Sequence, residues 1–272
     1  MSVKPSPVVP APAATLVLLR DRSAGGFELL LIQRHRASKF AAGDYVFPGG
    51  KVAADDSPDD PTAWCAGLDV TDAASTLGLE TAPRTALGYW IGAIRETFEE
   101  VGILLAYDAS GQWVRLDPGV SAAARVACHK DNRAFRDLLA AERLTLATDR
   151  LRYFAHWITP EENPLRFDTR FFVAMAPPDQ DAVADEHEII DVRWLGPREA
   201  LETFKRGEIS LRRPTVENIK LVSGLAATGE PAETAQAAID ALAGRTIPTI
   251  RPRVVTENGK PRPIMPGEPG WY

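Results

Sequence analysis

Three glutamates near the middle of the chain, Glu96, Glu99 and Glu100, have the residue type and spacing of a site for a hard cation. They lie in the stretch RETFEEVG, which is expected to be the last part of a helix closed by Gly102. Carboxylates three and four positions apart share one helix face and repel one another, and the helix dipole disfavours negative charge in the last turn. Because two local rules are broken together, we expect a cation to compensate. Oxygen ligands of this kind favour Mg²⁺ or Mn²⁺.

A solvated acidic face is the alternative interpretation of the same glutamates. On a helical wheel of about 100° per residue, an apolar stripe points one way and the glutamates point the other way. The stripe consists of Leu87, Ile91, Ile94, Phe98 and Val101. On this interpretation the helix, predicted from about Ala86 to Val101, packs by its stripe and exposes its acids to water.

A basic run precedes the Phe-Pro-Gly-Gly turn at residues 47–50. It contains Arg34, Arg36 and Lys39, which we interpret as substrate-binding residues. An arginine fork can bind two phosphate oxygens at once, and a lysine adds a point charge. A solvated run of charge is the alternative. The sequence therefore pairs a candidate cation site with a candidate phosphate clamp.

The elements that position these residues follow from apolar periodicity and turn signals. Strands are predicted for residues 14–21, 27–35, 44–50, 151–159, 169–176 and 188–196. Helices are predicted for residues 70–77, 86–101, 197–207 and 214–225, with two further pieces in 120–143 that break near 131–132. A hairpin is expected around Asn258 and Gly259. This order predicts an α/β (α+β) fold with a mixed sheet and helices on both faces.

Composition restricts the class of protein. The chain has 272 residues, 45% of them hydrophobic, and a net charge of −6. These values are typical of a globular protein and disfavour a nucleic-acid polymer as the main partner. Cys65 and Cys128 lack metal or redox spacing, so reduced thiols in a cytoplasmic protein are expected. The N-terminal apolar run is too short for a membrane span or a signal peptide.

The turn and the acidic helix together resemble the two halves of the Nudix hydrolase signature. That signature has a glycine, five residues, an acid, and then Arg-Glu-x-x-Glu-Glu-x-Gly before an apolar residue. The matching positions are Gly50, Asp56, Arg95, Glu96, Glu99, Glu100, Gly102 and Ile103. Asp56 stands where the family usually has glutamate. Asp56 and Arg95 are 39 positions apart, whereas the family spacing is eight, so about 31 residues are inserted.

The basic run resembles a motif of the coenzyme A diphosphatase subgroup of this family. The residues in register are Leu30, Leu31, Arg34, Gly43 and residues 47–50. The departures are Ile32 for Thr, His35 for Ser or Ala, and Lys39 for Arg. With its insertion, the chain is similar to the mammalian peroxisomal type of the subgroup and to bacterial relatives of that type.

The resemblance implies a Nudix-type α/β/α sandwich. Residues 1–12 are then expected to be a flexible lead-in, and residues 13–225 a Nudix hydrolase domain with its insertion at about 57–86. Residues 226–272 are expected to be a C-terminal extension of helices and a hairpin. No motif covers this last part.

The resemblance also implies metal-dependent hydrolysis of a diphosphate bond in a small nucleotide derivative. We expect coenzyme A or acyl-CoA to give 3′,5′-ADP and (acyl-)phosphopantetheine. Hydrolysis of ADP-ribose, NADH or another nucleotide is the alternative. A non-catalytic sensor with the Nudix fold is disfavoured, because a pure binder has no need of three mutually repelling acids. The sequence leaves the oligomeric state open, with a homodimer as one option.

The resemblance assigns roles to the residues of the motif. Glu96, Glu99 and Glu100 are the implied ligands of Mg²⁺ or Mn²⁺, with the Gly50 carbonyl as a fourth ligand. Arg95 is implied to orient a neighbouring glutamate by ion pairing, although a surface cation is the alternative.

The general base is left open by the resemblance. It is either a glutamate of the motif or a residue of the loop ADEHEIIDV, where Glu188 and Glu186 are the candidates. His187 is expected to be a loop residue, because water activated by a metal needs no imidazole.

Overall fold

The computed structural model describes residues 8–257 and 260–268 of the chain. The main sheet has the strand order β10-β7-β8-β1-β2-β3, with β4 paired to β1 and β9 paired to β2. Its strands are β1 (Ala11–Asp21), β2 (Phe27–Arg34), β3 (Tyr45–Val46), β4 (Gly49–Lys51), β7 (Arg152–Ile158), β8 (Phe167–Met175), β9 (Ile189–Leu195) and β10 (Thr249–Ile250). Strand β1 runs parallel to β8 and antiparallel to β2. The predicted mixed sheet is therefore confirmed.

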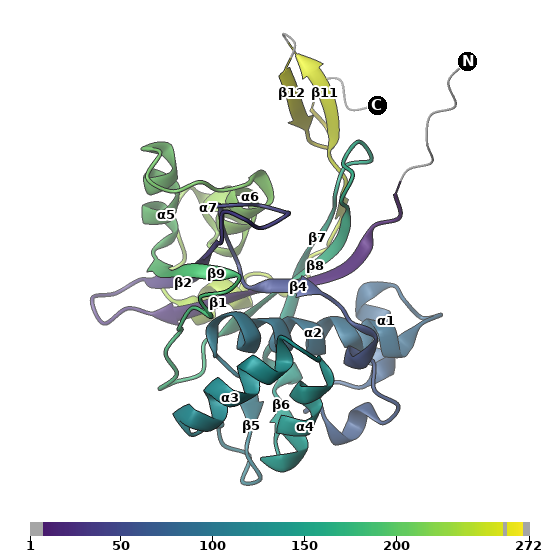
Figure 1. The fold of residues 1–272 in the computed structure, drawn as a ribbon. Helices are drawn as coiled ribbons and strands as arrows, with labels where there is room; N and C mark the ends of the chain where they lie inside the picture. Colours follow the sequence, from purple (N-terminus) through teal and green to yellow (C-terminus); the bar gives the residue numbers. More distant parts are fainter. Residues whose placement is uncertain (1–7, 258–259, 269–272) are drawn as a thin grey trace.

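Helices cover both faces of this sheet, so the predicted α/β/α sandwich is confirmed (Figure 1). The helices are α1 (Val70–Leu77), α2 (Pro83–Val101), α3 (Pro118–Cys128), α4 (Arg133–Ala141), α5 (Pro197–Lys205), α6 (Arg213–Val222), α7 (Leu225–Thr228) and α8 (Ala235–Asp240). Helices α1 to α4 lie on one side of the sheet, and α5 and α6 lie on the other (Figure 1). Two small antiparallel pairs complete the fold: β5 (Ala106–Tyr107) with β6 (Thr145–Leu146), and β11 (Arg253–Glu257) with β12 (Lys260–Ile264).

Strand β1 shows why both faces are covered. Its side chains alternate between the two faces, as in any strand. Leu16 and Leu18 join the core beneath α2, whereas Val17 and Leu19 join the core beneath α6 and α8, and all four are fully buried. A continuous apolar run of this kind requires a layer on each side of the sheet.

Helix α2 is buried more completely than its sequence predicts. It begins with Pro83 in the first turn and ends at Gly102, whose φ of 76° is left-handed and whose N–H bonds the Phe98 carbonyl. Glu99 and Glu100 are only 6% and 3% exposed, so the interpretation of a solvated acidic face is wrong. Strand β4 and the short 3₁₀ turn Ala54–Asp56 cover the face opposite the apolar stripe.

The insertion contains the short helix that the sequence predicts at residues 70–77. Asp69 caps α1 by accepting bonds from two backbone N–H groups, and Gly78 ends it in a left-handed conformation. Its buried residues Ala73, Ala74 and Leu77 join the same core as α2. The insertion is therefore packed onto the helix that carries the glutamates.

The C-terminal part, expected to be an extension of helices and a hairpin, also packs onto the domain. Strands β11 and β12 confirm the hairpin, whereas its Asn258-Gly259 turn lies outside the described residues. Strand β10 adds in parallel to β7, and α8 contributes Ala235 and Ile239 to the second core. These elements are too short to show a clear period. Among the described residues, no helix is long and apolar enough to span a bilayer.

Candidate active site

The two halves of the interrupted motif meet in space. Strand β4 pairs with β1 and holds its turn against the last part of α2. The Gly49 N–H donates to Glu100 Oε2 at 2.8 Å. A methyl group placed on Gly50 would lie 2.4 Å from the Glu96 carboxyl carbon. The 31-residue gap in sequence therefore leaves the motif contiguous in the structure.

Arg95 is the centre of a buried network of charge. Its side chain is 2% exposed, as is that of Asp56, to which it donates two bonds of 2.8 and 3.1 Å. It also pairs with Glu96 at 2.9 Å and Glu99 at 3.0 Å, and bonds the Lys51 carbonyl at 2.9 Å. Burial opposes its charge, but these partners, Asp56 first, raise the pKa of Arg95 overall. One guanidinium thus holds two glutamates and links both halves of the motif.

The three glutamates lie in an environment that is short of positive charge. Burial raises the pKa of Glu96 to about 7, despite the attraction of Arg95. Burial likewise raises the pKa of Glu99. The pKa of Glu100 lies well above its ordinary value, because burial and repulsion from Glu96 outweigh the Gly49 N–H and a nearby arginine. Buried carboxylates with raised pKa values are suited to a divalent cation.

The residues fit such a cation by their chemistry. In the described part of the chain, no three His, Cys, Asp or Glu side chains converge as a preformed metal site. The reason is that Glu96 and Glu99 turn toward Arg95, and Glu100 turns toward the Gly49 N–H. A cation would take its oxygens from carboxylates that these donors now hold.

The structure brings Arg34 and Glu188 to the motif. Arg34 lies 3.5 Å from Glu100 and 3.4 Å from Glu188, and its buried Nε has no hydrogen-bond partner. Glu188 reaches the site from the loop before β9, with its side chain 57% exposed. Arg36 and Lys39 are exposed and contact no charged partner among the described residues. Of the basic run, only Arg34 lies at the glutamates.

The loop before β9 is organised by Asp185 rather than by its histidine. Its carboxylate accepts the N–H groups of His187, Glu188 and Ile189 at 2.8–3.0 Å. Glu186 adopts a left-handed φ of 63° and is exposed. His187 is exposed too, with its ring 6.0 Å from that of His129. The structure therefore places His187 as a loop residue, as expected.

A pocket of about 470 Å³ adjoins the glutamates. Arg34 and Gly49, which both contact Glu100, also line this pocket. Most of its wall is aromatic or apolar, and it includes Phe40, Phe47, Trp157, Phe167, Phe171, Pro252, Val254 and Pro263. The last three come from the C-terminal part, for which the sequence suggested no role. Such a wall suits an apolar portion of a ligand.

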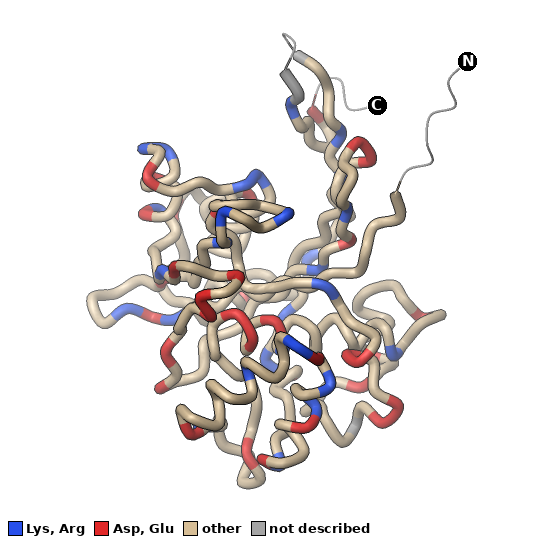
Figure 2. Tube along the Cα trace, viewed as in Figure 1, with Lys and Arg blue, Asp and Glu red and all other residues tan. Residues whose placement is uncertain are grey.

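Arg212 and Arg213 also line this pocket, and the sequence analysis missed both. Arg212 pairs with Asp44 at 2.7 Å and stacks 4.8 Å from the ring centre of Phe40. Arg213 pairs with Glu268 at 2.6 Å, and its buried Nε lies 3.7 Å from Glu217 without a hydrogen bond. Basic residues also lie along the C-terminal hairpin, whereas many acidic residues lie in the layer of α1 to α4 (Figure 2). Adjacent arginines at the start of a predicted helix are the signal that could have found them.

Comparison with known structures defines the class of fold. A crystal structure of a Nudix hydrolase from Alicyclobacillus acidocaldarius matches 88% of this chain and 99% of its own, with a TM-score of 0.70 and 24% identity. The fold is therefore that of a Nudix hydrolase.

Sequence comparison identifies the family. The model of the NUDT19 Nudix domain matches residues 81–222, more than half of the chain, and the chain belongs to this family. The acyl-coenzyme A diphosphatase NUDT19 of Homo sapiens is 30% identical over 245 residues, covering 78% of this chain and 64% of its own. The protein of the same name from Gallus gallus is 31% identical over 226 residues, covering 69% and 59%. The chain thus spans about three fifths of the length of these relatives.

Proposed function

We propose that this protein is a metal-dependent diphosphatase that hydrolyses coenzyme A or acyl-CoA to 3′,5′-ADP and (acyl-)phosphopantetheine. The observation that carries the proposal is the buried carboxylate cluster opening, through Arg34 and Gly49, onto an apolar pocket with two more arginines. The relatives named acyl-coenzyme A diphosphatase support the same substrate class.

The pocket suits a ligand that is charged at one end and apolar at the other. Arg34 and Arg213 each have a buried Nε that makes no hydrogen bond, and a phosphate oxygen can accept from such a donor. The aromatic wall offers an apolar surface to an acyl-pantetheine arm. Coenzyme A carries three phosphate groups and this arm, whereas ADP-ribose and NADH lack the arm.

The reaction needs a water molecule to attack phosphorus against the repulsion of a charged diphosphate. Divalent cations, Mg²⁺ or Mn²⁺, would be held by Glu96, Glu99, Glu100 and the Gly50 carbonyl, and would neutralise the diphosphate and acidify water. Arg95 keeps Glu96 and Glu99 in position. Arg34, beside Glu100, stabilises negative charge that develops on the diphosphate.

Glu188 is our candidate for the general base. Its carboxylate is half exposed, lies beside Arg34, and is not held by Arg95. It can therefore accept a proton from water without breaking the buried network. A glutamate of the motif is the alternative base. Two buried, unpaired thiols, Cys65 and Cys128, support the further proposal of a reducing, cytoplasmic compartment.

A substrate panel tests the proposal. Coenzyme A, acetyl-CoA, dephospho-CoA, ADP-ribose and NADH are incubated with Mg²⁺ or Mn²⁺, and products are resolved by mass. Activity should vanish in chelator and return with metal, and coenzyme A should exceed dephospho-CoA by roughly ten- to a hundredfold in kcat/KM, as expected for a charge-assisted contact.

Arginine variants locate that contact. Arg34→Ala or Arg213→Gln should reduce the preference for coenzyme A over dephospho-CoA. Lys39→Gln tests the exposed lysine of the basic run in parallel, and we expect a smaller effect. Equal turnover of coenzyme A and dephospho-CoA by the unmodified enzyme would contradict the proposed contact with the 3′-phosphate. A preference for ADP-ribose or NADH would contradict coenzyme A as the substrate.

A further inference from the structure

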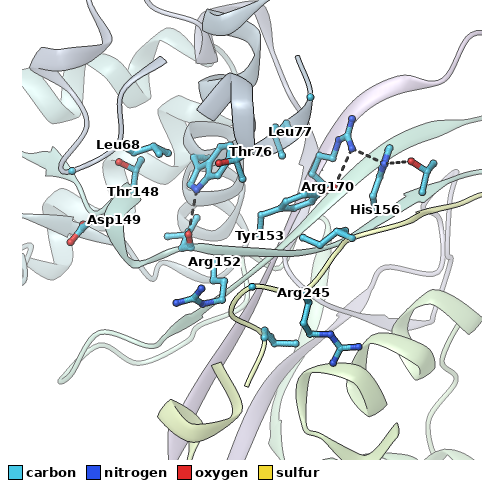
Figure 3. Close-up of a pocket in the computed structure, with 18 residues that line it drawn as sticks. Leu68, Thr76, Leu77, Thr148, Asp149, Arg152, Tyr153, His156, Arg170 and Arg245 are labelled. Carbon is cyan, nitrogen blue, oxygen red and sulfur yellow. Dashed lines mark hydrogen bonds between the residues drawn. The ribbon is translucent and has the colours of Figure 1, made fainter. Parts of the chain in front are cut away.

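A second cavity, of about 640 Å³, lies at the β7–β10 edge of the sheet (Figure 3). It shares no lining residue with the pocket at the glutamates. Trp90 marks its position on α2, ten residues and about 15 Å along the helix from Glu100. The cavity is therefore separate from the candidate active site.

Unpaired positive charge faces this cavity. Arg152 and Arg245 make no hydrogen bond or ion pair with the described residues, and the Arg152 Nε is buried. Arg170 is only 7% exposed and is already paired, since its Nε lies 3.7 Å from Asp168. Among the described lining residues, Asp149 is the one acid, and Arg150 already pairs with it at 3.3 Å. The lining thus has an excess of guanidinium groups.

Arg170 is held in place by a chain of hydrogen bonds, drawn as dashed lines in Figure 3. It donates to the Tyr153 hydroxyl at 3.2 Å and to His156 Nδ1 at 2.6 Å. Because a guanidinium only donates, Nδ1 must accept, and His156 Nε2–H then donates to Asp168 at 2.6 Å. The His156 ring and the Tyr153 hydroxyl together position Arg170.

The rest of the cavity combines an apolar wall with an open strand edge. Leu77, Trp90 and Ile247 contribute apolar surface. Strand β10 pairs with β7 only at His156 and Trp157, so no described strand covers the earlier part of the β7 edge. In Figure 3 the Arg152 and Arg245 side chains extend toward the same side of β7. A ligand here meets arginine forks and an apolar surface together.

We propose that this cavity binds a multivalent oxyanion, either a phosphate ester or a polycarboxylate, between Arg152 and Arg245. Planar guanidinium forks match the paired oxygens of both chemistries. The buried Nε of Arg152, which has no hydrogen-bond partner, explains why a ligand is needed, since buried donors are normally satisfied. The proposal is independent of the hydrolase assignment, because no residue of the motif takes part.

Calorimetric titration in metal-free buffer tests the proposal, with inorganic pyrophosphate and citrate as probes. We expect saturable binding of at least one probe to the full-length protein. The ratio of the affinities for pyrophosphate and citrate distinguishes recognition of phosphate from recognition of carboxylate. The double variant Arg152→Gln/Arg245→Gln should bind at least about tenfold more weakly, as for a lost charge-assisted bond. Arg245→Gln alone alters an exposed side chain and serves if the double variant folds poorly.

Two matched variants locate the binding. Arg143→Gln removes an exposed arginine outside the cavity and should bind the probe as the unmodified protein does. Arg34→Gln removes the arginine at the glutamates and therefore reports any part of the binding that occurs there. Unchanged affinity in the Arg152 and Arg245 variants overturns the proposal, and so does loss of binding in Arg34→Gln alone. The absence of saturable binding of either probe up to about 10 mM, a weak affinity on any scale, overturns it as well.

Discussion

The contact between Gly50 and Glu96 leads to a sharp prediction. A methyl group at Gly50 would lie 2.4 Å from the Glu96 carboxyl carbon, whereas ordinary contact begins at 3.4 Å. In Gly50→Ala the carboxylate must therefore retreat by about 1 Å. A displacement of this size can reduce turnover on the order of a hundredfold when a group is held in its catalytic geometry. We expect kcat to fall by about that factor.

The same change should leave the fold intact. The φ of Gly50 lies outside the left-handed region, so alanine can adopt it. Alanine also reduces the freedom of the unfolded chain, which stabilises by about 0.4–1 kcal/mol. This gain offsets part of any weakening of the Arg95–Glu96 pair. The unfolding free energy should change by about 1 kcal/mol or less.

The assay compares three glycine variants by kcat on coenzyme A and by urea unfolding. Gly119→Ala is the control, because the new methyl meets only a side-chain oxygen at 3.1 Å, away from the motif. Gly49→Ala should instead destabilise the fold, since its methyl meets the Ala14 carbonyl at 2.3 Å and its φ is 151°. Gly50→Ala with kcat within threefold of the unmodified enzyme, or with activity lost only as the fold is lost, refutes the reasoning.

Three further predictions address charge. Glu100→Gln should lower kcat at least about a hundredfold but keep or raise the melting temperature in metal-free buffer, because a neutral amide is easier to bury; a large loss of stability with full activity contradicts this. Asp56→Ala should lower the unfolding free energy in urea by about 3 kcal/mol, since it breaks a buried pair with Arg95; a loss below about 1 kcal/mol would show a weak pair. Burial alone would raise the pKa of Asp168, but the hydrogen bond to His156 lowers this pKa overall. The ionised Asp168 therefore stabilises the folded protein at pH values above the pKa of the unfolded state, and this stabilisation is lost as the pH falls through the pKa of the folded state. The stability difference between the unmodified protein and Asp168→Asn should be complete at about pH 6 and shrink below about pH 4; a constant difference contradicts the shift.

Local patterns were sufficient to predict the framework of the sheet. The apolar runs of β1 and β2 are long enough to mark strands buried on both faces. Helix α1 has a capping Asp69 and a terminal Gly78, and both signals lie within a few residues of the helix. Elements of two to six residues, such as β10 and α8, offer no comparable signal.

The surroundings of the glutamates could not be predicted from a helical wheel. The wheel separates Phe98 from Glu99 but says nothing of what covers each face, and here β4 covers the acidic one. The pairing of Asp56 with Arg95 was not predicted, because the family resemblance implied only that Arg95 pairs with a neighbouring glutamate. Arg213 reaches the pocket from more than a hundred positions later in the chain, and long-range convergence of this kind has no local signature.

The interruption of the motif has a consequence for loop-closure entropy. Bringing together ends 39 positions apart rather than eight costs only about 1.4 kcal/mol more, since each doubling of a loop adds about 0.6 kcal/mol. Burial of α1 against α2 offsets this cost. Because the buried Asp56–Arg95 pair clamps the segment at its two ends, the length between them is nearly free to vary. We therefore expect relatives to differ in the length of this segment while keeping the same geometry at the glutamates.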